Sequence, residues 1–170
     1  MNRKEIIQKI KESETIKIKF AVADIDGVLR GKYIHKEKFL EVAEKEIGFC
    51  DVIFGWDSGD SCYDNVALTG WHTGYPDAKA KIDLDTFREI PWENSVPFFL
   101  ADFSGENEHG AICPRSLLKK ITADCEAMGF KAFFAQEFEW FNFKGTPTEI
   151  HGTISKNCNP SLRECSDIRS

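Results

Sequence analysis

The sequence has fewer positive than negative charges and lacks any long hydrophobic run. Of its 170 residues, 22 are Lys or Arg and 28 are Asp or Glu, which gives a net charge of -6. Nucleic-acid binding depends on clustered Lys and Arg, so nucleic acid is not an expected partner. No run of about 18 apolar residues is present, so no membrane-spanning segment is expected. Residues 1–13 also lack the apolar core of a signal peptide.

Paired cysteine motifs are absent as well. The six cysteines are scattered, and none forms a CxxC pair. Without an export signal, scattered cysteines indicate reduced thiols and a cytoplasmic location. In contrast, the hydrophobic fraction is 42%, with 14 Phe and 4 Trp. A chain of this length and composition can bury a core without disulfides or a structural metal.

The first third of the sequence predicts a helix followed by a β-hairpin. Residues 1–14 intersperse charges with isoleucines, as a short amphipathic helix does. Residues 16–23 alternate and then become apolar, which predicts a strand entering a core. Asp26-Gly27 supplies tight-turn chemistry, and residues 28–34 form the expected return strand.

A long loop region and two short strands are predicted for the middle of the sequence. Residues 55–76 are rich in Gly, Asp, Ser and Asn, with aromatic residues between them. Loops of this length within compact domains are usually functional. Residues 80–84 and 96–103 have strand character.

The last third predicts a helix and a strand. Pro114 suits the first turn of a helix that runs to about Met128, with Gly129 as its C-terminal cap. Residues 131–143 are dense in aromatic side chains and are interpreted as a strand. Residues 145–170 are polar and without period, so an irregular tail is expected.

Asp24 and Asp26 first suggest a haloacid dehalogenase-like phosphatase. In such an enzyme Asp24 would be the nucleophile and Asp26 the general acid/base, with later acids such as Asp60 holding Mg²⁺. Only about 33 residues separate Asp26 from Asp60, whereas a parallel α/β core needs several crossovers of about 30 residues each. A hairpin turn is therefore the favoured interpretation, with the phosphatase kept as an alternative.

Two carboxylates near the middle of the aromatic segment form a second candidate site. Glu137 and Glu139 are two residues apart, so on a strand they share a face with their backbones about 6.5 to 7 Å apart. Carboxylates so placed can converge on one cation. The alternative is a solvent-facing strand carrying two acids without a role.

These residues resemble a known family. The segment 136–141 (QEFEWF) is similar to the first metal-ligand motif of glutamine synthetases, and the helix beginning at Cys113-Pro114 resembles the helix ahead of that motif. Further segments follow the order of the family's small N-terminal domain: 24–32, 77–85, 91–92 and 101–103. The resemblance spans residues 17–143.

The resemblance implies an α+β fold in which a β-grasp-like N-terminal domain precedes the start of a glutamine synthetase catalytic domain. The expected division is an N-terminal helix at 1–14, a β-grasp domain at 15–107, a helix and strand opening the catalytic domain at 108–144, and an irregular polar tail at 145–170. Because the family's catalytic domain continues for some hundreds of residues, we expect a truncated or partial gene product that is inactive alone.

The resemblance also implies a function. Family members are ATP-dependent ligases that join ammonia or an amine to the γ-carboxylate of glutamate through γ-glutamyl phosphate, and they form homo-oligomers. Glu137 and Glu139 match metal ligands for Mg²⁺ or Mn²⁺. Asp57 matches an aspartate that the family places near the ammonium site of the adjacent subunit, and loop capping is its alternative role. The segments FGWD at 54–57 and EWFNF at 139–143 resemble the divergent glutamine synthetase-like γ-glutamyl ligases more than the housekeeping enzyme, which leaves the amine acceptor open. A non-catalytic interaction module is a further alternative.

Overall fold

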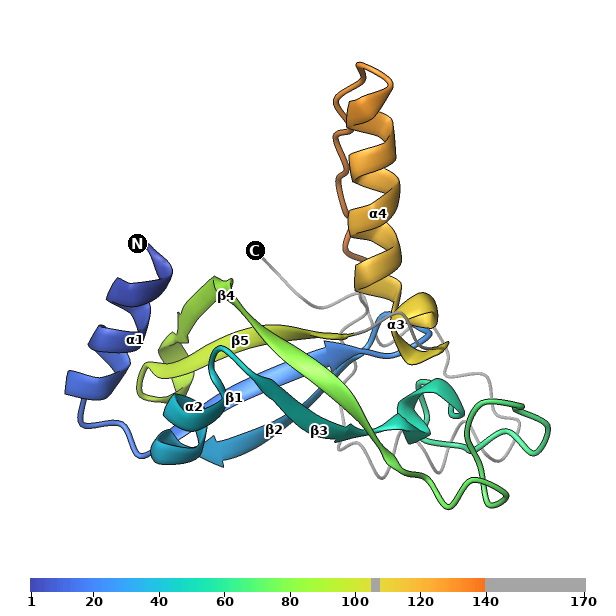
Figure 1. Ribbon diagram of the computed structural model, residues 1–170, viewed down its shortest axis with the longest axis horizontal. Helices are drawn as coiled ribbons and strands as arrows, with labels where there is room; N and C mark the ends of the chain where they lie inside the picture. Colours follow the sequence, from blue (N-terminus) through green and yellow to red (C-terminus); the bar gives the residue numbers. More distant parts are fainter. Residues whose placement is uncertain (105–107, 140–170) are drawn as a thin grey trace, which may run out of the picture. The chain divides into compact units, whose positions relative to one another are not determined.

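The computed structural model describes residues 1–104 and 108–139. The chain divides into two compact units, residues 1–132 and the residues from 133 onward. The helices and strands of the described residues lie in the first unit (Figure 1). They are, in order: α1 (Arg3–Glu12), β1 (Lys17–Ala23), β2 (Leu29–His35), α2 (Lys36–Val42), β3 (Glu46–Cys50), the 3-10 helix η1 (Asp51–Phe54), β4 (Asp77–Ile90), the 3-10 helix η2 (Pro91–Glu93), β5 (Val96–Phe103), α3 (Glu108–Ile112) and α4 (Pro114–Ala127).

Five strands form one mixed sheet in the order β2-β1-β5-β4-β3. Strands β1 and β2 make the antiparallel hairpin that the sequence predicted. Gly27 lies in its turn at a φ of 79°, a conformation that glycine adopts without strain. Strand β1 also pairs in parallel with β5, and β4 pairs antiparallel with both β5 and β3. The α+β class is therefore confirmed.

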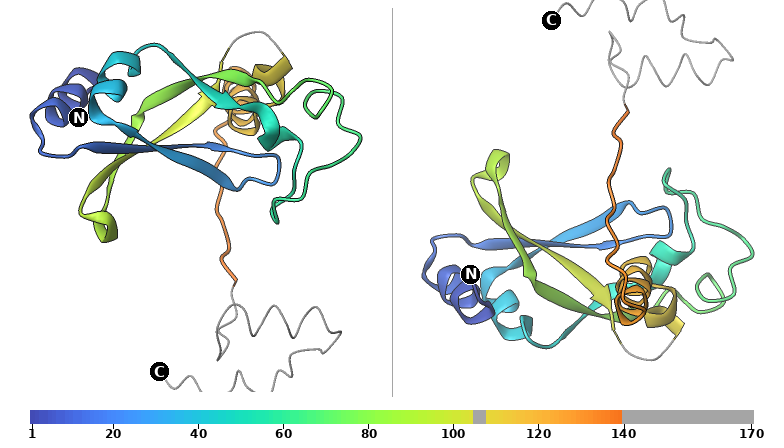
Figure 2. Two further views of the ribbon diagram at one scale, coloured as in Figure 1. Left: turned by 90° about the horizontal axis from the view of Figure 1, so that it is seen from below. Right: turned by 90° about the horizontal axis from the view of Figure 1, so that it is seen from above.

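One hydrophobic core joins the sheet to the first two helices. Ile6 and Ile10 of α1 are buried in the same cluster as Phe39 of α2 and Phe99 of β5. The rings of Phe39 and Phe99 stack with centroids 5.0 Å apart. Helices α1 and α2 lie at one end of the sheet, and the long loop of residues 55–76 lies at the other (Figure 2). Helices α1 and α2 therefore do not cover the end of the sheet where the loop lies.

Strand β4 is longer than the sequence suggested. It runs from Asp77 to Ile90 instead of 80–84, with irregular pairing between Asp83 and Arg88. Buried and exposed residues alternate along its first half, as expected for a strand with one face on a core. Charged residues alternate with the apolar ones along this strand, so no continuous apolar segment marked its full length. Strand β3 was not predicted at all.

The strand expected at 131–143 is wrong for the residues that the structure describes. Residues 131–139 carry no strand or helix, and the remainder of the predicted segment lies outside the described residues. A strand requires a hydrogen-bonded neighbour, and no described strand pairs with residues 131–139. Aromatic density alone therefore did not specify a strand. The tail predicted at 145–170 also lies outside the described residues.

Helix α4 confirms the predicted helix at 114–128, but none of its side chains is buried. Figure 1 shows it projecting from the sheet. Ion pairs fix its first turns: Arg115 binds Asp102 of β5 and Asp83 of β4, and Lys119 binds the same two carboxylates at 2.6 and 3.0 Å. No helix in the described ranges is long and apolar enough to cross a membrane.

The Asp83 network gives α4 a pH-dependent anchor. Desolvation would raise the pKa of Asp83, but hydrogen bonds from Arg115 and Lys119 outweigh it and hold this pKa below its ordinary value of 3.8. A carboxyl whose folded-state pKa is lowered stabilises the fold above its unfolded pKa. The contribution is therefore complete above pH 3.8 and disappears as the pH falls through the lower folded-state value.

We expect Asp83→Asn to speed hydrogen exchange of the α4 amides about tenfold at neutral pH, because a 14-residue helix without buried side chains is marginal on its own. Asp85→Asn, in the same strand but paired only at the exposed Arg3, is the matched control and should leave α4 protection unchanged. Protection factors of the wild type and Asp83→Asn should differ above pH 3.8 and converge once the pH has fallen below the lowered folded-state pKa of Asp83. If the two proteins differ as much in protection at low pH as at neutral pH, the assignment is contradicted.

Candidate functional site

The loop after η1 carries Asp57, the candidate catalytic residue. Asp57 Oδ1 accepts hydrogen bonds from the backbone amides of Gly59 (2.8 Å) and Ser61 (2.9 Å). The Asp57 amide in turn donates to the Ser61 carbonyl. One carboxylate oxygen thus caps the loop, which is the alternative role expected for this residue. Among the described residues the other oxygen has no hydrogen-bond partner, so capping leaves it available to a cation or an amine.

Asp24 lies at the end of β1, beside the Asp57 loop, and it is fully buried. Its Oδ1 accepts from the amides of Asp26 (3.0 Å) and Val28 (2.8 Å), and its Oδ2 accepts from Arg30 Nε (2.7 Å). A phosphatase nucleophile must reach its substrate, and this carboxylate has no exposed surface. Strand β1 also leads into an antiparallel hairpin. The phosphatase alternative is therefore wrong, and the hairpin-turn interpretation holds for Asp24.

Arg30 of β2 connects the hairpin to the Asp57 loop. Besides its bond to Asp24, its Nη2 donates to the backbone carbonyl of Asp57 (3.0 Å), and its Nη1 pairs with the Asp60 carboxylate. The guanidinium also lies 4.8 Å from the ring centroid of Trp56. The hydrogen bond to Asp24, partly offset by desolvation, raises the pKa of Arg30. The loop that carries Asp57 is thus held by a permanently charged group.

A second buried carboxylate fixes the far side of the loop region. Asp51 of η1 is fully buried. It accepts a hydrogen bond from Thr69 Oγ1 (2.6 Å), and its other oxygen lies 3.2 Å from Nε2 of His109 in α3. Thr69 belongs to the same loop region, and His109 belongs to a separate helix. Asp51 therefore ties the loop to α3 through two side-chain contacts.

The two candidate metal ligands belong to the second unit. Glu137 and Glu139 are exposed there, as is Phe138 between them. Within residues 1–104 and 108–139, no group of three or more His, Cys, Asp or Glu side chains is placed to hold a metal. Carboxylate oxygens are the donors that Mg²⁺ and Mn²⁺ prefer. The pair therefore fits a metal chemically but supplies only part of a coordination shell.

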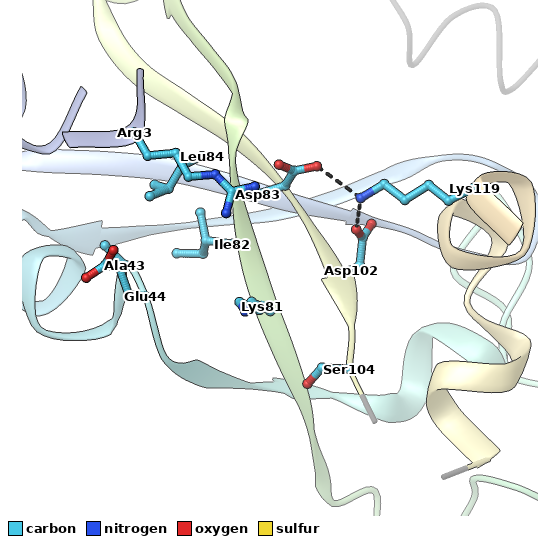
Figure 3. A pocket seen from close by; sticks show the side chains of 10 residues that line it. All are labelled: Arg3, Ala43, Glu44, Lys81, Ile82, Asp83, Leu84, Asp102, Ser104 and Lys119. Atoms are coloured by element: carbon cyan, nitrogen blue, oxygen red, sulfur yellow. Dashed lines mark hydrogen bonds and ion pairs between the residues drawn. The ribbon is translucent and has the colours of Figure 1, made fainter. Parts of the chain in front are cut away.

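A cavity of about 460 Å³ lies beside β4 and β5, and none of its lining residues belongs to the Asp57 loop (Figure 3). It is lined by Arg3, Ala43, Glu44, Lys81, Ile82, Asp83, Leu84, Asp102, Ser104 and Lys119. Figure 3 shows Lys119 reaching both Asp83 and Asp102 across it. This lysine is committed to the two acids, so the cavity belongs to the anchor of α4.

The sequence proposed Asp57, which stays a prediction, but assigned no role to Arg30, Asp51 or His109. Arg30 lies within the segment 24–32 that resembles the family, but no role was predicted for it. The spacing of the hairpin could have indicated this role. Arg30 pairs with Val22 across the turn, which places Arg30 close to Asp24. Nothing local marks Asp51 and His109, because 57 residues of chain separate them.

Comparisons with known proteins identify relatives over nearly the whole chain. It is 54% identical over 162 residues to Type-1 glutamine synthetase 2 of Dictyostelium discoideum and 33% identical over 164 residues to glutamate–isopropylamine ligase of a Pseudomonas species. The first match covers 94% of this chain and 31% of the relative, and the second covers 94% and 36%. The chain thus spans about a third of the length of these relatives. No family model matches.

Solved structures show the same fold. GmaS without ligand matches 72% of this chain and 26% of its own, with a TM-score of 0.55 at 20% identity. Plasmodium falciparum glutamine synthetase matches 76% of this chain and 23% of its own, with a TM-score of 0.54 at 16% identity. At these identities the comparison concerns the fold alone.

The match to the Dictyostelium relative covers 94% of the chain. Sequence similarity therefore extends into residues 145–170.

Proposed function

Because this chain belongs to the glutamine synthetase family, we propose that it forms the N-terminal part of an ATP-dependent ligase that joins ammonia or an amine to the γ-carboxylate of glutamate. The observation that carries this proposal is the 54% identity to a glutamine synthetase over 162 residues. The match to glutamate–isopropylamine ligase and a 28% match to γ-glutamylethanolamide synthetase GlnA4 of Streptomyces coelicolor support the broader ligase class.

In this proposal the chemistry has two steps. A γ-carboxylate oxygen of glutamate attacks the terminal phosphorus of ATP, forming γ-glutamyl phosphate and releasing ADP. The amine nitrogen then attacks the acyl carbon, so the amide forms and phosphate leaves with the former carboxylate oxygen. Bound Mg²⁺ or Mn²⁺ would neutralise charge on the transferring phosphoryl group. Glu137 and Glu139 would hold such an ion together with ligands from the rest of the enzyme.

Asp57 is assigned to the amine side of the reaction. Its free carboxylate oxygen can accept a hydrogen bond from ammonium or an alkylammonium ion, and its negative charge favours that cation. A base must also remove a proton before the nitrogen can attack, and a carboxylate beside the bound cation can receive it. The fixed loop geometry therefore suits binding and deprotonation of the nucleophile.

Supporting arguments also exist for location and assembly. The four cysteines among the described residues are free thiols, as a reducing cytoplasm would keep them.

Helix α4 buries no side chain and exposes Leu117, Leu118 and Ile121 by half or more. Such a face favours a partner surface, and it is the observation behind the second candidate function, an interaction module within a homo-oligomer.

The proposed function can be tested by a chimera in which this chain replaces the matched segment of the Dictyostelium relative. We expect ATP- and glutamate-dependent amide formation with at least one of ammonia, isopropylamine or ethanolamine, measured by mass spectrometry of the product. The 170-residue chain alone should form none. A folded, oligomeric chimera that forms no amide with any of the three would contradict the catalytic role and leave the interaction module as the better account.

A further inference from the structure

A charged cluster centred on Arg30 joins the β1–β2 turn to the Asp57 loop. All three nitrogens of the Arg30 guanidinium are bonded: Nε to Asp24, Nη1 to Asp60 and Nη2 to the Asp57 carbonyl. The Arg30 side chain is only 16% exposed. A guanidinium presents its donors in a rigid fork, so these three contacts fix the distance and direction between turn and loop.

The turn side of this cluster is itself immobile. The Asp24 carboxylate is held by two backbone amides and by Arg30. These amides belong to a turn closed by a hydrogen bond between the Asp24 amide and the Val28 carbonyl. A charge of this kind costs much to bury unless it is paired. Asp24 therefore requires Arg30, and Arg30 can act as a fixed support for whatever it binds.

On the loop side, Arg30 contacts the residue that bears the candidate carboxylate and the residue three positions later. Its Nη2 holds the Asp57 carbonyl, while the Asp57 side chain closes the loop onto Gly59 and Ser61. The guanidinium carbon also lies over the ring of Trp56, the residue before Asp57. Backbone and neighbours of Asp57 are thus fixed from one direction, which leaves few orientations for its carboxylate.

We infer that Asp24 and Arg30 form a positioning pair that sets the orientation of the Asp57 carboxylate toward the amine substrate. This inference rests on the proposed function, because it assigns the pair to the same site. Neither residue contacts substrate. Their effect on the reaction passes through the loop backbone, and it is therefore expected in the binding of the amine and not in the binding of ATP.

The first test uses the 170-residue chain and does not depend on ligase activity. Arg30→Gln alone would leave Asp24 buried and unpaired, so it is combined with Asp24→Asn, which keeps an oxygen for the Asp26 and Val28 amides. We expect hydrogen exchange at residues 57–61 to become about tenfold faster, as for loss of one charge-assisted hydrogen bond, with β5 protection unchanged. Arg3→Gln, which removes an exposed Arg–Asp pair, is the control. Unchanged loop exchange in the double variant would overturn the inference.

The second test uses the ligase chimera and separates positioning from stability. Arg30→Lys retains a cation for Asp24 but cannot reach three acceptors at once. We expect it to raise KM for the amine about tenfold, the effect of one lost charge-assisted contact, while KM for ATP and the melting temperature stay near wild type. Wild-type KM for the amine in a chimera carrying Arg30→Lys would overturn the positioning role. An inactive wild-type chimera would instead count against the proposed function. Hydrogen exchange at residues 57–61 would then still show whether Asp24 and Arg30 hold the loop.

Discussion

Replacing Phe99 with alanine should lower the free energy of unfolding by about 3 to 5 kcal/mol, the usual cost of emptying a large aromatic site in a core. Phe99 has no exposed surface. Its ring stacks on Phe39 of α2 and lies 5.6 Å from the ring of Phe87 of β4. The cavity would therefore open where the central strand β5 meets α2 and β4, and three elements would lose contacts together.

Urea unfolding of the 170-residue chain measures this effect. Since single domains are stable by only about 5 to 15 kcal/mol, we expect a large fall in the midpoint with little change in slope. Phe134→Ala is the matched control, because Phe134 is 74% exposed and its removal leaves the core intact. If both variants unfold at the same urea concentration, the core assignment is wrong.

Replacing Glu137 with glutamine in the ligase chimera should lower the rate of amide formation about 100-fold or more, because a correctly held divalent cation stabilises phosphoryl transfer by several kcal/mol. Glu139→Gln should have a similar effect if the two carboxylates share an ion. Glutamine keeps the size of the side chain and removes its charge, so folding should be unaffected.

The matched control for this change is Glu126→Gln, which removes an exposed glutamate of α4 outside the motif. It should leave the rate unchanged. A raised Mg²⁺ or Mn²⁺ concentration should partly restore the Glu137→Gln chimera, since a weakened site is filled by mass action. The ligand role would be contradicted if no metal concentration restored Glu137→Gln and if Glu126→Gln lost as much activity.

The parts of the fold with local signals could be predicted from the sequence. The β1–β2 hairpin has a tight Asp-Gly turn between two apolar stretches, and α4 begins with Pro114 and is followed by Gly129 at a φ of 85°. The long loop of residues 55–76 was indicated by its composition. Each of these signals lies within a few residues of the feature it specifies.

The parts that failed depend on distant partners. Residues 131–139 have the aromatic content of a strand, but no described strand pairs with them. Strand β4 was recognised only in part, because its exposed face carries Lys and Asp that pair with other elements, as Asp83 does with Arg115. For Asp24 the sequence favoured a hairpin turn, which the structure confirms, but it did not predict the contact with Arg30.

The residues of the candidate site stay predictions. Asp57, Glu137 and Glu139 were proposed from short motifs in the order of one family, and the comparisons support that family. The supports of the loop region were not predictable, because they come from distant elements. Arg30 of β2 binds the Asp57 carbonyl, Asp51 of η1 binds Thr69, and His109 of α3 contacts Asp51. Motifs specify reacting groups, whereas tertiary contacts specify their orientation.

The central claim is that this chain serves a ligase that activates the γ-carboxylate of glutamate as an acyl phosphate. The most direct test supplies the chimera with glutamate labelled with ¹⁸O in the γ-carboxylate, together with ATP and the accepted amine, and measures ¹⁸O in the released phosphate. The account predicts one ¹⁸O atom transferred to phosphate for each amide formed. Amide formation that releases only unlabelled phosphate would contradict it.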